Sequence, residues 1–400
     1  MHNVIEMKSI KYISPAVSQP SCFVRAKRLG HAPQRRVFKL AVSQRISSEL
    51  ERILDSQDLE RPDGFDAKQM LNISEAFWRA MKEKNGTKAV KRVVEIVDGE
   101  YEKDSPVDFD VIIVGGTLGI FAALSLQLKG KSICVVEKRK VHGRTQEWNI
   151  SRQDFELLVR LGMLSSSDLE SCIVSEWEKD RICFNGSKKE FWVEGILNLG
   201  VCPQKLISIV REKFLEAGGT IVEYTVFKKA VVHKDRVEIH QSHVSSLSAQ
   251  DVNPADVNRP GSMSSSKKVG SGFESRKSMT SRLLIDCMGH YSPIVKQMRA
   301  GQKEDGVVLV VGGCFSGIDN ARNSSADLLM TIDDSENDMQ LFWEAFPAAG
   351  GDMRTVYMFA YSDACPSRPG FKQLLQKFLE KIQRYQVSLV LLCLYVQSCP

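Results

Sequence analysis

Three glycines and one acid between residues 115 and 137 have the types and the spacing that suit a phosphate and a sugar. Gly115, Gly116 and Gly119 follow a short apolar run, and Thr117 lies among them. A helix that begins at a glycine turn offers free N–H groups and a positive dipole end to a pyrophosphate. Glu137 comes about 20 residues later, where an acid can accept a hydrogen bond from a ribose hydroxyl. These residues predict an adenine dinucleotide as the ligand.

Three predicted elements must hold these residues in place. Asp110–Val114 is apolar and rich in β-branched residues, which is typical of a buried parallel strand. Ile120–Leu128 predicts a helix, and Ser132–Val136 predicts a second strand that ends at Glu137. The turn is one residue short of the full G-x-G-x-x-G pattern, so a purely structural strand–helix–strand unit without a ligand is the alternative interpretation.

The composition indicates a globular protein with an uneven distribution of charge. The chain has 400 residues, of which 43% are hydrophobic, and a net charge of +5. Its length predicts two or three domains. Residues 1–45 hold nine Lys and Arg residues and one acid, Glu6, so the basic excess belongs to this leader. Charge therefore gives no support for nucleic-acid binding, and no apolar run is long enough to predict a transmembrane helix.

The leader is poor in acids and rich in Ser, Ala, Val and basic residues, without a continuous apolar segment. This composition is typical of an organelle transit peptide and not of a secretory signal. A disordered basic arm is the alternative. We assign residues 1–60 to this segment.

Cysteine and histidine spacing gives little indication of a metal site. The ten cysteines are scattered and none forms a C-x-x-C pair, so we interpret them as reduced thiols, mostly in the core. His240 and His243 lie at the start of a Ser-rich stretch, where we expect a solvated loop.

The remaining pattern predicts further helices and strands around the nucleotide unit. A helical extension is expected over 61–105, beside the nucleotide unit, with Ala67–Lys84 as helix and Lys88–Val97 undecided between helix and strand. Ser151 and Asp154 fit a capping box for a helix from Arg152 to about Leu161. The other expected helices are Pro203–Ala217 and Phe371–Tyr385; the expected strands are Thr220–Phe227, Ala230–His240, Arg282–Asp286, Val307–Val311, and an antiparallel pair, Gln340–Phe346 and Thr355–Tyr361.

Residues 241–280 hold 11 serines, with Asn, Pro and Gly between them. Such a segment buries too little apolar surface to order itself, so it predicts a disordered loop between two strands.

Four segments together resemble one family: the GGTLGIF turn, the EKR after the second strand, the GRTQEWNISR stretch, and LLIDCMGHYSPIVKQMR. They are similar to FAD-dependent oxidoreductases of the lycopene cyclase and geranylgeranyl reductase type. The resemblance is strongest to a plant plastid group of FAD/NAD(P)-binding oxidoreductases, or lycopene β/ε-cyclase-like proteins. It covers roughly residues 106–385, and EWNISR and WEAFPA are its more specific motifs.

The resemblance implies FAD as cofactor and a role for each matching residue. Gly115, Gly116 and Gly119 face the FAD pyrophosphate, with Thr117 in the same turn, and Glu137 holds the adenosine ribose. Lys138 and Arg139 flank the adenine. Arg152, with Arg144 as a second candidate, reaches the cofactor phosphates. Asp286 and Gly289 match a second flavin motif, D-x-x-G. For Arg144, Arg152, Lys138, Arg139 and Asp286 the alternative is a purely structural or solvated side chain.

Two departures from the family pattern concern the reaction. The family carries a third cofactor motif, G-D-A, and this sequence has none; Gly351-Asp352 is its single Gly-Asp pair. Residues 387–396 are mostly apolar, which suggests the end of a truncated form. The cyclase acid of F-L-E-E-T also lacks a counterpart in Val356–Ala360, which holds no carboxylate. We name no catalytic residue from the sequence.

The sequence thus predicts an α/β protein with a Rossmann-like three-layer FAD/NAD(P)-binding domain and a β-rich substrate domain that is incomplete at its C-terminal end. The first comprises 106–165, 200–240 and 280–300, and the second 170–199 and 305–365, with a C-terminal helix and apolar tail over 366–400. The resemblance implies a chloroplast FAD-dependent oxidoreductase that acts on an apolar substrate, with isoprenoids and carotenoids as candidates, and peripheral contact with a membrane. The alternatives are a lycopene cyclase-like non-redox flavoprotein and a truncated non-catalytic form.

Overall fold

The computed structural model describes residues 51, 67–83, 90–99, 101, 106–144, 146–184, 190–243, 276–289, 292–302, 304–316, 325–348 and 353–386. All of them belong to one compact unit, residues 45–400. Most of the leader, most of the Ser-rich segment and the apolar tail after residue 386 lie outside the described residues, so the predictions for them stay predictions. At the two ends of the Ser-rich segment the expected disordered loop is wrong, because residues 241–243 and 278–280 belong to the strands Val237–His243 and Ser278–Asp286.

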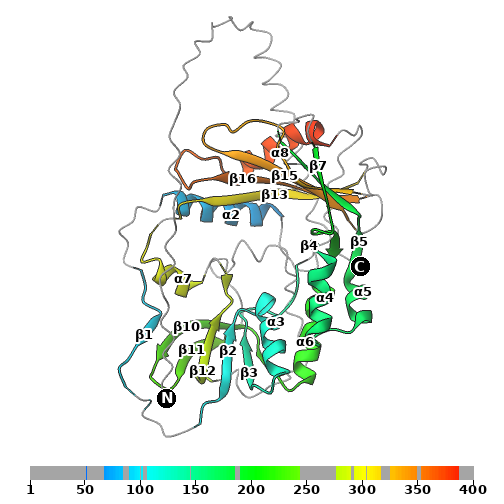
Figure 1. Ribbon diagram of the computed structural model, residues 1–400. Coiled ribbons are helices and arrows are strands. Elements are labelled where there is room, and N and C mark those ends of the chain that lie inside the picture. Colours follow the sequence, from blue (N-terminus) through cyan, green and yellow to red (C-terminus); the bar gives the residue numbers. More distant parts are fainter. Residues whose placement is uncertain are drawn as a thin grey trace, which may run out of the picture. The chain divides into compact units, whose positions relative to one another are not determined.

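The first sheet contains the predicted strand–glycine–helix–strand unit (Figure 1). Strand β2 (Phe109–Val114) leads through Gly115 into helix α3 (Gly116–Gln127), and β3 (Ile133–Val136) lies parallel to β2. The sheet has seven strands in the order β1-β10-β11-β12-β2-β3-β9. Its central strands β12 (Ser278–Asp286), β2, β3 and β9 (Thr220–Val222) are parallel. The Rossmann-like α/β fold predicted from the sequence is confirmed.

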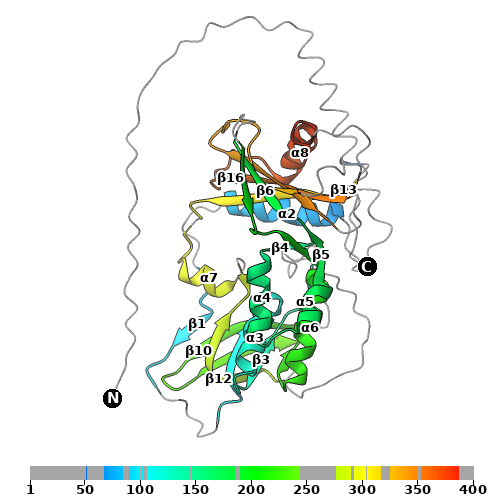
Figure 2. The same ribbon diagram turned by 45° about the vertical axis from the view of Figure 1, so that its right-hand side comes forward.

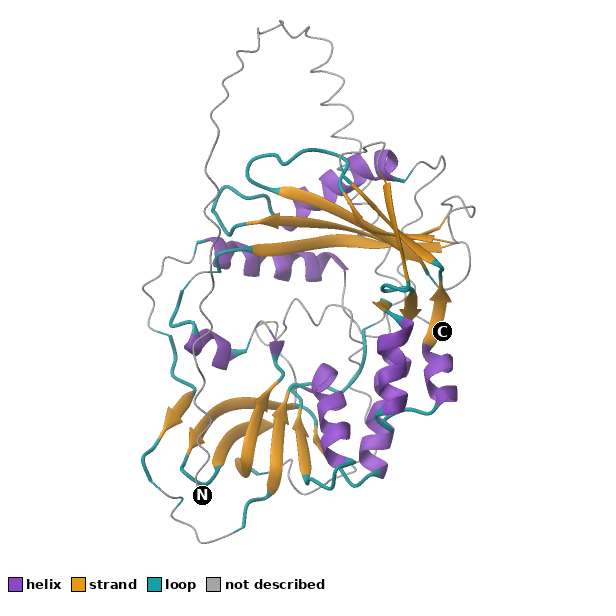
Figure 3. Cartoon of the chain, viewed as in Figure 1, coloured by secondary structure: helices purple, strands orange, loops and turns teal. Residues whose placement is uncertain are grey.

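The two faces of these parallel strands are covered differently. On one face Val111, Ile113 and Ile133 pack with α3 and α6 (Pro203–Glu216), because alternate strand residues point to the same side. On the other face Ile112 and Val114 pack with residues of two antiparallel strands, β10 (Thr225–Val232) and β11 (Val237–His243). Strands therefore form the covering layer on this second side, opposite the helices (Figure 3).

A second sheet has six strands in the order β13-β16-β15-β14-β6-β7. Its strands are β6 (Lys179–Cys183), β7 (Glu190–Glu194), β13 (Val307–Ser316), β14 (Ser325–Met330), β15 (Gln340–Pro347) and β16 (Met353–Ser362). The predicted antiparallel pair is confirmed as β15 and β16. The strand predicted over Val307–Val311 extends five residues further, to Ser316.

Helices α2 (Ala67–Lys82) and α8 (Phe371–Tyr385) pack on one face of this second sheet. Trp78 of α2 and Phe378 of α8 are buried with Trp343 in the same core. Figure 2 shows the two helices beside the strands of the six-stranded sheet. The prediction that the 61–105 segment lies beside the nucleotide unit is therefore wrong for α2. It holds for β1 (Val94–Ile96), which pairs with β10 and resolves the undecided segment as a strand.

A small three-stranded sheet contains β4 (Trp148–Ile150), β8 (Leu199–Val201) and β5 (Ile173–Glu176). Along the chain, helix α4 (Arg152–Arg160) follows β4, and helix α5 (Ser166–Cys172) precedes β5. It is bonded to the six-stranded sheet through side chains. Asn149 donates to Glu344 at 2.5 Å, and Ser175 donates to the Pro347 carbonyl at 2.8 Å.

Three local predictions need correction. Ser151 begins α4 but makes no capping bond, because its hydroxyl accepts the Leu197 amide at 3.0 Å; the capping box lies at Ser165 and Asp168 instead. The strand expected over Ala230–His240 is a hairpin that turns between Val232 and Val237, and Thr220–Phe227 is divided between β9 and β10. No helix among the described residues is both long and apolar enough to span a bilayer.

Candidate functional site

The carboxyl ends of β2, β3 and β12 meet at one edge of the first sheet. The chain turns from β2 through α3 to β3 on one side, whereas β12 joins β2 on the other side from a distant part of the sequence. In open α/β sheets, ligands bind at this reversal of strand order, outside the carboxyl ends. Gly115 follows β2 and Cys287 follows β12, and the Cys287 amide donates to the Val114 carbonyl at 2.7 Å.

Glu137 contacts the first turn of α3 directly. One oxygen of its buried carboxylate accepts the Gly116 amide at 2.6 Å, and the other accepts the Arg139 amide at 3.2 Å. A carboxylate at a helix N-terminus is stabilised by the unpaired N–H groups and by the positive end of the helix dipole. The predicted proximity of Glu137 to the glycine turn is therefore present, and the carboxylate takes up one of the helix donors.

Each glycine of the turn is required by a close neighbour in the chain itself. Gly115 has a φ of +102°, and a Cβ there would overlap the Cys287 carbonyl and lie 2.8 Å from the Met288 nitrogen. A Cβ on Gly116 would lie 2.6 Å from Cγ2 of Val141. On Gly119 it would lie 2.8 Å from Cγ2 of Ile113, so this glycine lets the helix approach its strand. Tight packing of the chain alone accounts for all three glycines.

Thr117 is different, because packing does not account for its hydroxyl. Its side-chain oxygen is buried and has no hydrogen-bond partner among the described residues. It lies in the first turn of α3, next to the N–H groups that the helix itself cannot satisfy. A buried hydroxyl without a partner costs about 1–3 kcal/mol, so such a group in a native structure calls for an explanation.

Asp286 and Gly289 form a turn that packs against the glycine loop. The Asp286 carboxylate accepts the Met288 amide at 2.9 Å and the Ser292 hydroxyl at 2.5 Å. Gly289 adopts a φ of +71°, which favours glycine. The D-x-x-G residues therefore shape the turn after β12 and bring its backbone against Gly115, while the Asp286 oxygens are engaged within the turn.

The basic residues predicted near the cofactor have different surroundings. Arg139 is buried and Lys138 is half-buried, directly after Glu137. Arg144 donates to the carbonyls of Gln146 and Glu147, at 3.1 and 2.9 Å, and so stabilises its own loop.

Arg152 contacts two carboxylates in this structure, and the phosphate role that the resemblance implied for it stays a prediction. Its guanidinium donates to Glu176 through Nε and Nη2, at 2.9 and 2.8 Å, and to Glu170 through Nη1 at 2.8 Å. All three of its side-chain nitrogens are engaged by the two carboxylates, which raise the pKa of the guanidinium.

A buried acidic group on β15 escaped the sequence analysis. Glu344 lies directly opposite Tyr357 on β16, and burial raises the pKa of its carboxyl to about 7. Burial also raises the pKa of Asp180 on β6 to about 6, and that of Tyr357 to about 12. The Tyr357 hydroxyl and one Asp180 oxygen have no hydrogen-bond partner among the described residues. A lone acid in the alternating strand pattern of WEAFPA was the available signal.

No group of three or more His, Cys, Asp or Glu side chains suited to a metal ion occurs in the part of the chain that the structure describes. His240 and His243 lie on strand β11 and not in a loop, which corrects the sequence-based expectation.

Comparisons with known proteins gave structural similarities only. No family model and no curated protein matches the chain. Among solved structures, a geranylgeranyl bacteriochlorophyll reductase-like protein from Thermoplasma acidophilum is similar at 15% identity and a TM-score of 0.45, over 72% of this chain and 62% of that one. The p-nitrophenol 4-monooxygenase PnpA from Pseudomonas putida DLL-E4 is similar at 13% identity and a TM-score of 0.47, over 73% of this chain and 64% of that one.

A third similar structure is a mutant of the halogenase PltM in complex with FAD, at 11% identity and a TM-score of 0.46, over 68% of this chain and 56% of that one. The chain spans less than two thirds of the length of each of these three proteins.

Proposed function

We propose that the N-terminus of α3 binds the diphosphate of an adenine dinucleotide, FAD, and that the chain acts as a FAD-dependent oxidoreductase. The observation that carries the proposal is the buried, unpartnered hydroxyl of Thr117 in the first turn of α3. A phosphate oxygen at that position would accept from the hydroxyl and from the adjoining helix N–H groups.

The contacts of Gly116 must change when the diphosphate binds. Glu137 accepts the Gly116 amide, and Val141 lies close over Gly116. A diphosphate at this turn displaces the carboxylate from Gly116 because both are acceptors of the same N–H group. The released carboxylate is then available to a ribose hydroxyl at the end of β3, and Val141 moves aside.

In the proposed activity the cofactor, when bound, supplies the redox chemistry, and the protein binds and orients it. Gly115, Gly116, Thr117 and Gly119 are its diphosphate residues, and Glu137 is its sugar residue. An apolar substrate, isoprenoid or carotenoid in kind, and a plastid location remain part of the proposal on the strength of the sequence resemblance. Membrane contact of the peripheral type is included on the same basis.

A pair of threonine variants tests the diphosphate site. Thr117→Val removes the unpartnered hydroxyl and keeps the shape of the side chain, so it should stabilise the ligand-free protein by about 1 kcal/mol and weaken FAD binding about tenfold. Thr280→Val is the control, because the Thr280 hydroxyl donates to Asp108 at 3.0 Å, and its loss should destabilise the protein without changing FAD affinity.

Urea unfolding and FAD titration of both variants provide the two measurements. Equal FAD affinity in wild type and Thr117→Val would exclude the hydroxyl from the site.

A lycopene cyclase-like, non-redox activity is the second candidate, and Glu344 is the observation that favours it. A mostly buried carboxyl with a pKa of about 7 can hold a proton at neutral pH and give it to an apolar substrate. Conversion of lycopene in the presence of reduced FAD is the assay. A cyclic product that is formed by wild type and not by Glu344→Gln supports the cyclase-like activity. Flavin binding without any cyclic product excludes it and supports the oxidoreductase activity.

A form without catalytic activity is the third candidate. Its supporting observation is the packing of the glycine turn, in which Cys287 and Val141 occupy the positions next to Gly115 and Gly116. A purified protein that is colourless and takes up no added FAD supports this candidate and excludes the first two.

A further inference from the structure

A cavity of about 650 Å³ lies away from the glycine turn, at the edge strand of the six-stranded sheet. Its wall comes from three segments that are far apart in the sequence: α2, the loop after α7 (Pro293–Met298) with the start of β13 that follows it, and the first residue of α8. Pockets for small molecules commonly measure about 300–1,000 Å³. The size of this cavity therefore suits a small organic ligand.

Apolar and polar surface contribute about equally to the wall, and the apolar part comes mainly from α2, β13 and α8. Trp78 and Leu309 are buried core residues whose edges reach the cavity, and Phe77, Met81, Val307 and Phe371 also line it. This part of the wall favours an apolar ligand body, since burial of apolar surface contributes roughly 25 cal/mol per Å².

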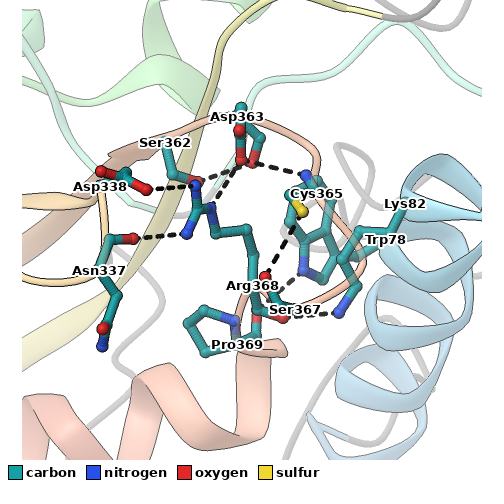
Figure 4. A network of polar contacts seen from close by, with 10 residues as sticks. All are labelled: Trp78, Lys82, Asn337, Asp338, Ser362, Asp363, Cys365, Ser367, Arg368 and Pro369. Carbon is teal, nitrogen blue, oxygen red and sulfur yellow. Dashed lines mark hydrogen bonds and ion pairs between the residues drawn. The ribbon is translucent and has the colours of Figure 1, made fainter.

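The Trp78 side of the cavity is held in place by a polar network (Figure 4). The indole of Trp78 donates to the Pro369 carbonyl at 2.9 Å, and Lys82 donates to the Arg368 carbonyl at 2.7 Å. The Arg368 guanidinium in turn donates to Asp363 at 2.6 Å and to the Asn337 carbonyl. These contacts fix α2 against the 363–369 loop, so this part of the wall is formed before any ligand arrives.

The Phe371 side is fixed as well. The amide of Phe371, at the N-terminus of α8, donates to the Glu75 carboxylate of α2 at 2.6 Å. The same carboxylate packs against Gly370, where a Cβ would overlap it. Helices α2 and α8 therefore present Trp78 and Phe371 to the cavity from a bonded pair of elements.

One end of the cavity is polar and carries an unused acceptor. Arg299 donates to one oxygen of Glu304 at 2.9 Å. The other oxygen of Glu304 is buried and has no hydrogen-bond partner among the described residues. Asp305 also lines this end, so its three charged groups are one cation and two anions. This end therefore favours a hydrogen-bond donor and disfavours an anion.

We propose that the cavity binds an apolar molecule with a single hydrogen-bond-donating head group, a hydroxyl or an ammonium, which the Glu304 carboxylate accepts. The site is separate from the proposed dinucleotide site, because none of the residues that line it belongs to α3, β3 or the turn after β12. It does not depend on the proposed function, and either one can fail without the other.

Three probes with the same alkyl chain and different head groups test the proposal: dodecanol below its solubility limit, and dodecylammonium and dodecanoate below their critical micelle concentrations. Calorimetric titration of the full chain should show saturable binding of the alcohol and the amine. Dodecanoate should bind at least tenfold more weakly, because its head would meet Glu304 and Asp305. Equal binding of all three probes, or binding of none, would overturn the proposal.

Two variants and a control locate the binding. Glu304→Gln keeps the size of the side chain and removes its charge, so it should weaken dodecylammonium binding about tenfold and narrow the preference over dodecanoate. Met81→Trp fills the cavity and should weaken the alcohol and the amine alike. Glu380→Gln, at an exposed position of α8 that does not line the cavity, should leave binding of every probe unchanged.

Urea midpoints of all three variants establish that each protein is folded. If Met81→Trp proves to be unfolded, Glu304→Gln still tests the proposal. Unchanged binding of dodecylammonium by Glu304→Gln would contradict the role of Glu304 as the acceptor of the head group.

Discussion

The Glu137 carboxylate accepts the Gly116 amide at 2.6 Å, and this contact joins the end of β3 to the first turn of α3. Glu137 is the residue predicted to hold a sugar, and the N–H group of Gly116 is one of those predicted to hold a phosphate. In this structure the two satisfy each other. Binding of a dinucleotide must separate them, so the contact is both a source of stability and a competitor of the ligand.

The first prediction concerns the stability that this contact provides. In Glu137→Gln the side chain can still accept the Gly116 amide, but it loses the negative charge at the helix N-terminus. Without FAD, the free energy of unfolding should fall by about 1 kcal/mol. Urea unfolding of Glu137→Gln beside the exposed Glu380→Gln gives the comparison. An unchanged midpoint would show that the carboxylate does not cap α3.

A second prediction separates Arg152 from the cofactor. Arg152→Met breaks the ion pairs with Glu170 and Glu176, which are partly exposed, so it should cost about 1 kcal/mol or less. FAD affinity should stay unchanged, because the guanidinium is engaged elsewhere. Arg160→Met, at the other end of the same helix, is the control. A tenfold loss of FAD affinity in Arg152→Met alone would restore its predicted role at the phosphates.

The third prediction is a pH dependence that arises from Glu344. Burial raises the pKa of its carboxyl from an ordinary 4.5 to about 7, so the folded state binds the proton more tightly than the unfolded state. The contribution of the Glu344 carboxyl to the free energy of unfolding is fully present below its pKa in the unfolded state. This contribution, up to about 3 kcal/mol, is lost as the pH rises through about 7.

Glu344→Gln cannot ionise, so its stability should fall less than that of wild type between about pH 5 and about pH 8. Urea unfolding at the two pH values measures the difference. Parallel pH profiles for the two proteins would show that the buried carboxyl does not titrate in this range.

A fourth prediction tests the packing of the loop after Glu137. A Cβ on Gly143 would overlap the backbone of Pro203, the first residue of α6, and neither backbone segment can move freely. Gly143→Ala should therefore lower the free energy of unfolding by about 1–3 kcal/mol. Gly99→Ala is the matched control, since nothing lies near its Cβ position. Equal stabilities would contradict the close approach of the loop to α6.

The sequence predicted the elements in which periodicity and local signals agree. The run of β-branched residues before Gly115 placed β2, and the apolar run Ser132–Val136 placed β3. The helix between them was also predicted, but α3 begins at Gly116 and not at Ile120. The amphipathic pattern of Pro203–Ala217, which begins with a proline and ends at two glycines, likewise predicted α6 to within a residue. These signals are local, so a single chain suffices to interpret them.

Long-range partners were not predictable in the same way. Ser151 has the sequence environment of a capping residue, but its hydroxyl accepts an amide 46 positions away, from Leu197. Arg152 is similar, because its carboxylate partners come from α5 and β5. Trp78 lies in a segment with the pattern of an amphipathic helix, and that pattern does not indicate which sheet the helix covers. In each case tertiary packing selected the partner.

The glycines of the turn show how much of the candidate site could be predicted from the sequence. Gly115 and Gly116 were predicted from the needs of a phosphate, and the structure gives each an additional reason in the Cys287 carbonyl and the Val141 side chain. The Thr117 hydroxyl, which packing leaves without a partner among the described residues, could not be recognised from the sequence.

Titration of the purified full-length protein with FAD tests the central proposal most directly, because the diphosphate site at α3 requires that this ligand bind. The account predicts saturable binding at one site per chain, with an affinity about tenfold lower in Thr117→Val and unchanged in Thr280→Val. Absence of binding to the folded wild-type protein, or equal binding by all three proteins, would contradict it.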